Sequence, residues 1–328
     1  LTAAALSAYA QVLFADHKGV GALLFLASAL SPRSGLHGLA AVLLGHALVR
    51  LLRLSEAAAA HGRYGYNPLL VGLAVGTYFE PGAGTAALLL LSVVAVVFLE
   101  AALESALGAV FYLPLLSLPF VLVTWLSLAA APYVGILARA APELIPPHGP
   151  AWLPDAADLY LRSLGAVFFS PTVAAGGLVL AALVLHSRIA VLLTALGFGV
   201  AHGLSTFVFT FASDGALLVL NANAMLAALA LGGVWFVPER AAFLLAGAAA
   251  LLTSFGTAGA LALLRPLGLP VMILPFNVTM LVALAATPAI LLRLPCRSPP
   301  FSISISAYWI APMTWPAKRA PGWRPTGP

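Results

Sequence analysis

Two glutamates, Glu100 and Glu104, have the spacing that most directly suggests chemistry. They lie four residues apart in a long apolar stretch, so a helix would place both carboxyl groups on one face. Carboxyl groups inside an apolar region are candidates for proton transfer or ion binding. One hypothesis is therefore a proton-coupled carrier or an enzyme acting within a membrane. The alternative is that the pair lies near the end of the stretch and serves packing or subunit contacts.

A second group of residues offers uncharged hydrogen-bonding chemistry. Gln11 lies in an apolar segment, where a buried amide needs partners. Asn67 and Asn223 are suited to cap a broken helix or to satisfy backbone groups without a partner. Pro119 and Pro275, if they lie inside helices, each free the carbonyl oxygen four residues earlier. These residues predict a row of oxygens and amides for a neutral polar solute. The alternative is that the prolines only start helices.

Other kinds of site have little support. The chain has no HExxH, G-x-S-x-G or phosphate-loop motif, and its histidines are not grouped at metal-ligand spacing. Its single cysteine, Cys296, allows no internal disulfide or thiolate cluster. The net charge of +5 is spread out, without a basic run carrying interleaved aromatics. We therefore expect no enzymatic activity, no cofactor or metal, and no nucleic-acid partner.

The elements that position these residues must lie in a membrane. Of the 328 residues, 62% are hydrophobic and only 8% are charged, whereas soluble domains carry about 25% charged residues. The sequence therefore predicts an all-α integral membrane protein that crosses the bilayer many times. Apolar stretches lie at about 19–31, 37–54, 68–79, 84–111, 114–131, 172–187, 189–212, 215–236, 241–264 and 269–292.

The organisation along the chain is in two halves. Short amphipathic pieces near 5–15 and 160–169 precede the first long stretch of each half, and we expect them to be re-entrant. A Pro-rich, charged segment separates the halves, and a Pro-, Ser- and Trp-rich segment follows them. Because the chain begins at Leu1 rather than at methionine, we expect a fragment or a trimmed chain. The predicted regions are a first membrane repeat 1–131, a linker 132–159, a second membrane repeat 160–293 and an irregular tail 294–328.

Charge placement predicts the orientation. With five crossings per half and a cytoplasmic N-terminus, most arginines in the connections fall inside, and Glu80, Glu143 and Asp214 fall outside. This bias follows the positive-inside rule, although Arg33 and Arg265 oppose it. We therefore expect a multi-pass protein of the cell (inner) membrane, with the linker on the extracellular or periplasmic side.

Self-similarity is the strongest structural signal in the sequence. The segment Leu113-Pro114-Leu115-Leu116-Ser117-Leu118-Pro119-Phe120 is similar to 269–276, at an offset of 156, and the same offset relates Asn67 to Asn223. An odd number of crossings per half would give the two copies opposite orientations. The sequence therefore predicts an inverted repeat of two five-helix halves, each with one re-entrant half-helix, and a pore at the pseudo-two-fold interface between them.

These motifs resemble those of the urea transporter family. The resemblance rests on Gln11-Val12-Leu13-Phe14, Gly65-Tyr66-Asn67-Pro68-Leu69-Leu70 and Leu113-Pro114 through Pro119-Phe120 in the first half. In the second half it rests on Asn223-Ala224-Met225-Leu226-Ala227 and Leu269-Pro270 through Phe276-Asn277. It runs from about residue 7 to about residue 292.

The resemblance implies a homotrimer in the bilayer, with one narrow slot per protomer through which urea diffuses down its gradient. It implies that Gln11 accepts hydrogen bonds from urea at the end of the first re-entrant helix. It also implies that wall and mid-pore residues come from both halves; by similarity these are Phe14, Tyr66, Leu70, Thr124, Val167, Leu226 and Thr279.

This sequence departs from the family pattern at two positions. Ala166 stands where the second re-entrant helix usually has Gln or Glu, and Ala222 replaces the aromatic residue expected beside Asn223. One end of the slot would then be less polar and wider. Three hypotheses remain: a passive urea channel, a channel for another small neutral solute such as a short amide, ammonia or water, and a proton-coupled carrier or intramembrane enzyme that uses Glu100 and Glu104.

Overall fold

The computed structural model describes residues 3–54, 63–108, 111, 113–140, 148–211 and 213–291. The predicted tail 294–328, Cys296 and part of the predicted linker lie outside these residues.

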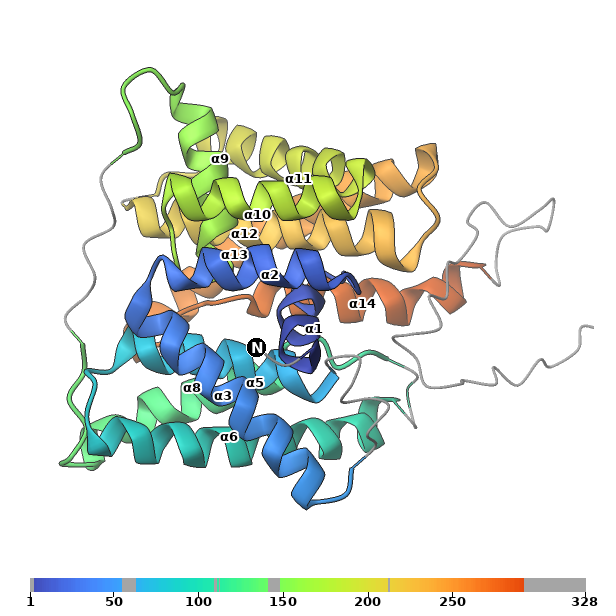
Figure 1. Cartoon of the computed structure of the whole chain (residues 1–328). Helices are drawn as coiled ribbons and strands as arrows, with labels where there is room; N and C mark the ends of the chain where they lie inside the picture. Colours follow the sequence, from blue (N-terminus) through green and yellow to red (C-terminus); the bar gives the residue numbers. More distant parts are fainter. Residues whose placement is uncertain are drawn as a thin grey trace, which may run out of the picture.

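The described residues form helices joined by turns, and each predicted apolar stretch coincides with one of these helices (Figure 1). No strand forms among them, apart from an isolated antiparallel bridge between Phe79 and Arg139. The N-terminal half contains α1 (Ala3–Gln11), α2 (Lys18–Ala29), α3 (Pro32–Leu51), α5 (Arg63–Tyr78), α6 (Ala83–Leu103) and α8 (Leu118–Ala130). The C-terminal half contains α9 (Asp155–Ala166), α10 (Val173–His186), α11 (Arg188–Phe207), α12 (Asp214–Ala230), α13 (Arg240–Leu264) and α14 (Leu274–Leu291).

Several helices have the length and composition of membrane spans. Where α6 and α12 end, π-helical turns extend them to Gly108 and Trp235. Large apolar side chains such as Leu126 and Leu244 are exposed on the outer surface, as lipid contact requires. The all-α integral membrane class is therefore confirmed. By length and hydropathy, five helical segments among the described residues are long enough to cross a bilayer: Pro32–Leu51, Ala83–Gly108, Arg188–Phe207, Asp214–Trp235 and Arg240–Leu267.

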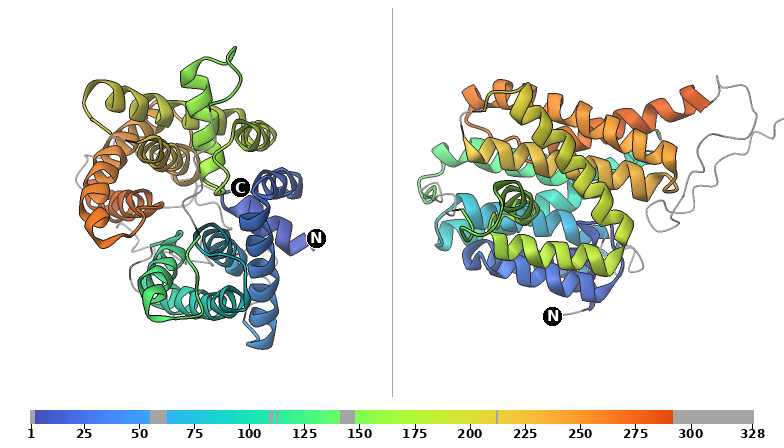
Figure 2. Two further views of the ribbon diagram at one scale, coloured as in Figure 1. Left: turned by 90° about the vertical axis from the view of Figure 1, so that its left-hand side faces the viewer. Right: turned by 90° about the horizontal axis from the view of Figure 1, so that it is seen from above.

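The two halves have the same internal packing. In the N-terminal half α1 packs on α2, α3 on α5, and α6 on both α5 and α8. The corresponding contacts in the C-terminal half join α9 to α10, α11 to α12, and α13 to both α12 and α14. Across the halves α2 packs on α10 and α8 on α14, so corresponding helices meet. Viewed along the long helices, the two halves form two groups of helices side by side (Figure 2).

Helices α1 and α9 are short and differ from the others in direction. They have 9 and 12 residues and lie across the direction of the long helices (Figure 1). Each ends in the same turn, with a phenylalanine in the left-handed region, at φ 59° for Phe14 and 55° for Phe169. The N–H of Phe14 donates to Gln11 O at 2.9 Å, and that of Phe169 donates to Ala166 O at 3.0 Å. Non-glycine residues seldom adopt this conformation, so the matched turns are a specific shared feature.

The contacts of α1 and α9 with the next helix are equally close. A Cβ added to Gly21 would lie 2.0 Å from Leu6 O, and one added to Gly176 would lie 1.9 Å from Leu161 O. Only glycine permits this approach of two backbones. Each short helix is therefore fixed against its neighbour through a glycine.

The positions of the two motif prolines differ from the mid-helix position considered above. Pro119 and Pro275 are each the second residue of a helix, α8 and α14, where a missing N–H costs no helical hydrogen bond. The carbonyl four residues before Pro119, that of Leu115, accepts a hydrogen bond from Leu118 N at 3.4 Å. The break lies instead three residues before each proline, where Leu116 and Met272 adopt left-handed conformations.

Helix α9 begins at Asp155, inside the predicted linker 132–159. It follows Pro154 in an extended conformation, and its first turn carries Asp155 and Asp158. Acidic side chains near a helix N-terminus stabilise it through the helix dipole. This local electrostatic effect extends the helix beyond the apolar residues from which its start was predicted.

Candidate functional site

A cavity lies where segments of both halves meet. Its lining comes from the ends of α1 and α9, from α5 and α12, from the segments that lead into α8 and α14, and from the first turn of α14. Six of its side chains were predicted as pore residues: Gln11, Phe14, Tyr66, Leu70, Val167 and Leu226. The remaining lining residues are Val12, Leu116, Ser117, Ile273 and Phe276.

The lining is mainly apolar, with a few polar groups. Tyr66 and Leu70 lie one turn apart on α5, Val167 follows α9, and Leu226 lies on α12. All four are buried, so the cavity lies inside the protein. An apolar cavity with few polar groups is typical of sites for small neutral molecules.

Gln11 is the one carboxamide among the lining side chains. It is the last residue of α1, and 6% of its surface is exposed. Its side chain makes no hydrogen bond to the part of the chain that the structure describes. A buried amide in this state has hydrogen-bonding capacity for a molecule in the cavity.

Two phenylalanine rings, one from each half, contact aromatic rings of the opposite half. The ring of Phe14 lies 5.6 Å from that of Trp235 and 6.3 Å from that of Phe276, both in the C-terminal half. In the opposite direction, the ring of Phe169 lies 6.3 Å from that of Phe120 in the N-terminal half. The two turns that follow α1 and α9 thus contact corresponding residues of the opposite half.

The side chains of Asn67 and Asn223 form hydrogen bonds with the backbone where the chain turns before α8 and α14. The amide of Asn67 donates to Leu116 O at 3.4 Å, and that of Asn223 donates to Met272 O at 2.7 Å. The Oδ1 of Asn223 also accepts from Phe276 N at 3.0 Å. Backbone groups in an apolar interior need such partners, so these amides fix the shape of the cavity wall.

Hydrogen bonds also join the two halves beside the cavity. Asn277 Oδ1 accepts from the N–H of Ser117 at 3.0 Å and from its hydroxyl at 3.2 Å. The indole N–H of Trp125 donates to Pro270 O at 2.8 Å. The bonds of Ser117 involve a lining residue, and all three bonds fix the two halves relative to each other.

Thr124 and Thr279 do not line this cavity. Thr124 is buried on α8, and its hydroxyl has no hydrogen-bond partner among the described residues. Thr279 is half-buried on α14. Both follow the motif phenylalanines Phe120 and Phe276 by about one helical turn, on the two helices that pack across the halves.

Five lining residues were not predicted. Val12 is adjacent to Gln11, and Leu116, Ser117, Ile273 and Phe276 all belong to the repeated proline motif. The repeated motif could have predicted the last four of these residues, because both copies of it contribute side chains to the same cavity. The left-handed turn that directs these residues inward is a backbone property, which their residue types do not reveal.

Glu100 and Glu104 lie behind the cavity wall rather than in it. Glu100 is buried on α6 and accepts a hydrogen bond from Asn67 Nδ2 at 3.1 Å. Glu104 accepts one from the Tyr64 hydroxyl at 2.8 Å. Neither carboxyl group contributes to the cavity lining.

Ala166 and Ala222, the two departures from the family pattern, also lie outside the lining. Ala166 is the last residue of α9 and Ala222 is buried on α12. The C-terminal half supplies Val167, Leu226 and the motif residues, but no carboxamide or carboxylate side chain. The two halves of the chain thus contribute side chains of different polarity to the lining.

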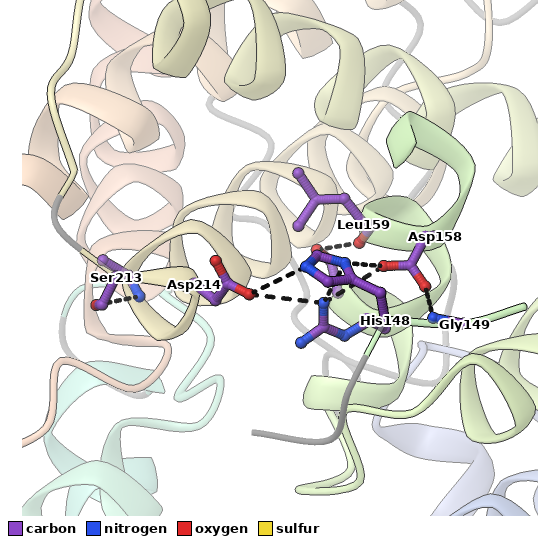
Figure 3. A network of polar contacts seen from close by, with 9 residues as sticks. His148, Gly149, Asp158, Leu159, Ser213 and Asp214 are labelled. Carbon is purple, nitrogen blue, oxygen red and sulfur yellow. Dashed lines mark hydrogen bonds and ion pairs between the residues drawn. The ribbon is translucent and has the colours of Figure 1, made fainter. Parts of the chain in front are cut away.

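A charged network lies away from the cavity, at the start of α9 (Figure 3). Arg162, only 2% exposed, has Nη1 3.3 Å from Asp158 Oδ2 and 3.8 Å from Asp214 Oδ2. Asp158 also accepts from Gly149 N at 2.7 Å and lies 3.2 Å from His148 Nδ1. Burial acts to raise the pKa of Asp158, but these hydrogen bonds outweigh it and hold its pKa below the ordinary value.

The arrangement suits binding without a metal ion or covalent chemistry. Within the described ranges, no three His, Cys, Asp or Glu side chains are grouped as a metal site. The cavity lining carries one carboxamide, one phenol and one serine hydroxyl, and otherwise apolar or aromatic side chains. Such a lining can hydrogen-bond a small uncharged molecule and contact its faces.

Comparison with protein families agrees with this geometry. A family model described as "UT: Urea transporter" matches residues 2–288, which is most of the chain and includes every residue of the cavity lining. It is a family of transporters, not of enzymes, so the prediction of no enzymatic activity is confirmed and the intramembrane-enzyme hypothesis is wrong. The chain therefore belongs to the urea transporter family, whose activity is the passive movement of urea across a membrane.

Proposed function

We propose that the cavity between the two halves is part of a narrow channel through which urea diffuses down its gradient. The observation that supports this most directly is the convergence of Gln11, Tyr66 and Leu70 with Val167 and Leu226 in one lining. Four different segments of the chain contribute these side chains. Thr124 and Thr279 extend the proposed path beyond the cavity, because the unpartnered hydroxyl of Thr124 is suited to bond a passing solute.

The chemistry of urea fits this lining. Urea is flat, neutral and strongly dipolar, with N–H donors on its edges and one carbonyl acceptor. The Gln11 carboxamide and nearby backbone oxygens can accept its N–H groups, while Phe14 and Leu70 contact its faces. Each hydrogen bond left unmade in such a site would cost about 1–3 kcal/mol. The free-energy cost of desolvating an ion is far greater, so the route favours neutral solutes.

We further propose that the two halves form an inverted repeat, with α1 and α9 as re-entrant half-helices. Both are too short to cross a bilayer at about 1.5 Å per residue. The matched turns at Phe14 and Phe169 and the matched glycine contacts support a shared unit in each half. The reciprocal ring contacts of these phenylalanines support a pseudo-two-fold relation that passes near the cavity.

The assembly that we propose is a homotrimer in the cell (inner) membrane, with one channel per protomer. In this arrangement the repeats are 1–131 and 160–293, and α9 extends the second repeat back to Asp155. The path lies within one chain, since both halves of a single protomer line the cavity. A trimer would then cover part of the exposed apolar surface without forming the channel itself.

A second candidate, a channel that also accepts short amides, is favoured by the asymmetry of the lining. Gln11 has no carboxamide or carboxylate counterpart in the C-terminal half, where Ala166 ends α9. A solute that forms fewer hydrogen bonds than urea would lose less binding free energy on the side of the cavity that the C-terminal half lines. Acetamide is the simplest probe of this alternative.

The deciding experiment is solute uptake by the purified protein in liposomes. We expect rapid entry of labelled urea that is independent of a pH gradient and reduced by a urea analogue that occupies the channel. Acetamide or ammonia flux without urea flux would instead support the second candidate. A proton-driven current that is lost in Glu100→Gln would support a proton-coupled carrier and contradict the passive channel.

A further inference from the structure

We propose that Glu100 is a positioning residue that holds the N-terminal wall of the cavity in place through Asn67. This inference rests on the proposed function, because it assigns a role in selecting the solute that passes. Glu100 contacts no part of the cavity itself. Its effect reaches the lining through two successive hydrogen bonds.

The first bond joins two buried side chains from different helices. The Nδ2 of Asn67 on α5 lies 3.1 Å from Oε1 of Glu100 on α6. Asn67 is fully buried, and Glu100 is only 3% exposed. A hydrogen bond to a carboxyl group in such an environment holds the amide in one orientation.

The second bond connects Asn67 to the cavity wall. The same Nδ2 lies 3.4 Å from the carbonyl oxygen of Leu116, which also accepts the hydroxyl of Tyr66. Both Leu116 and Tyr66 line the cavity. Leu116 has a left-handed backbone at φ 51°, which depends on surrounding contacts for support. The orientation of Asn67 therefore bears on the position of two wall residues.

The corresponding site in the C-terminal half has no need of a carboxyl group. There Asn223 Nδ2 donates to Met272 O and, at 2.9 Å, to Val219 O in its own helix. Its Oδ1 accepts from Phe276 N at 3.0 Å. Backbone groups alone thus fix the amide of Asn223, and the residue at the position of Glu100, 156 residues on, is Gly256.

The N-terminal half keeps the contact with the break, from Asn67 to Leu116 O, but lacks the counterparts of the other two backbone contacts. Helix α5 is kinked at Tyr64, with φ −84° and ψ 19°, directly after Arg63, the residue four before Asn67. The Oδ1 of Asn67 has no hydrogen-bond partner in the described part of the chain. Glu100 supplies the acceptor that the regular helix supplies to Asn223. This difference between the halves explains a carboxyl group at one site and glycine at the other.

The test compares Glu100→Leu, which removes the acceptor, with Glu100→Gln, which keeps an amide oxygen for Asn67. We expect Glu100→Leu to raise the half-saturating urea concentration by about fivefold or more, the scale of one lost buried hydrogen bond, and to lower the flux ratio of urea to methylurea. Glu100→Gln should restore both quantities to within about twofold of wild type. Glu104→Leu is the matched control, since Glu104 bonds Tyr64, which lies outside the lining.

A double-mutant cycle with Asn67→Ala tests the connection itself. If Glu100 acts through Asn67, Glu100→Leu has no further effect on either quantity in the Asn67→Ala background. If Glu100→Leu does not yield folded protein, Asn67→Ala alone should produce the same rise and the same loss of selectivity. Equal effects of Glu100→Leu in both backgrounds, or unchanged selectivity in Asn67→Ala, would overturn the inference. Absence of urea flux in the wild-type protein would instead overturn the proposed function.

Discussion

At the scale of one residue, Gln11 has a buried polar side chain that does not contribute a hydrogen bond to the described part of the fold. Its side chain is buried beside the cavity yet forms no hydrogen bond within the described protein. A residue that contributes to the fold through its polar atoms would have such a bond, as Ser7 has to Ala3 O at 3.2 Å. The amide of Gln11 is therefore available to solute.

The first prediction concerns this amide. Gln11→Ala should lower urea flux by about fivefold or more, because the loss of one hydrogen bond in a desolvated site costs about 1–3 kcal/mol. The oligomeric state should not change, since no side-chain hydrogen bond to the described protein is lost. Stopped-flow uptake and size-exclusion chromatography measure the two quantities. Ser7→Ala, one turn earlier on α1, is the control, and full flux in Gln11→Ala would contradict the assigned lining.

At the scale of elements, the short helices α1 and α9 depend on close backbone contact with the helices that follow them. Gly21 and Gly176 each face a carbonyl oxygen at a distance that leaves no room for a side chain. The short helices have few residues with which to form other contacts. Their positions, and those of Gln11 and Val167 at their ends, therefore depend on these glycines.

The second prediction compares two adjacent glycines. Gly176→Ala places a Cβ against Leu161 O and should destabilise the protein by about 1–3 kcal/mol, because the contact is with backbone that cannot move aside. Gly177→Ala has no atom within 4 Å of the added Cβ and should leave stability unchanged or slightly higher. Thermal unfolding in detergent measures both, and equal midpoints for the two variants would refute the packing of α9 on α10.

At the scale of the whole molecule, the turns and helix contacts of the two halves correspond, whereas their charged groups do not. The Arg162 network occurs at the start of α9, where the linker segment meets α12 through His148 and Asp214. It fixes the start of the C-terminal half against its own central helix. Its contribution to stability should therefore depend on pH.

The third prediction follows from the depressed pKa of Asp158. A carboxyl group whose pKa is lower in the folded state stabilises the protein fully above its ordinary value of 3.8 and loses this contribution as pH falls through the folded-state value. At neutral pH, Asp158→Asn should lower stability by about 1.5–3 kcal/mol. The difference in stability between Asp158→Asn and the wild type should become smaller at pH values below the ordinary pKa of aspartate, 3.8. Thermal midpoints measured across pH test this, and a pH-independent difference would argue against the role of the carboxylate.

The fourth prediction tests the inverted repeat directly. Gly82 and Pro238 are exposed, corresponding positions in the two halves, 156 residues apart. In a Cys296→Ser background, Gly82→Cys and Pro238→Cys should react with an impermeant thiol reagent from opposite sides of the membrane. Sealed vesicles of defined orientation provide the measurement. Labelling from the same side would show that the halves are parallel.

The membrane class and the ten apolar stretches could be predicted from residue types alone, because burial in a bilayer leaves a signal along the chain, and the similar motifs of the two halves could be read there as well. The sequence also pointed to Gln11, Tyr66 and Leu70, since a motif that recurs in a family marks them. The folded structure was needed to show that Phe276 and Ser117 share a cavity with Gln11, and that Glu100 is connected to the cavity wall through a hydrogen bond from Asn67. These relations join segments far apart in sequence, and the packing and backbone turns that bring them together leave no periodic pattern in residue types.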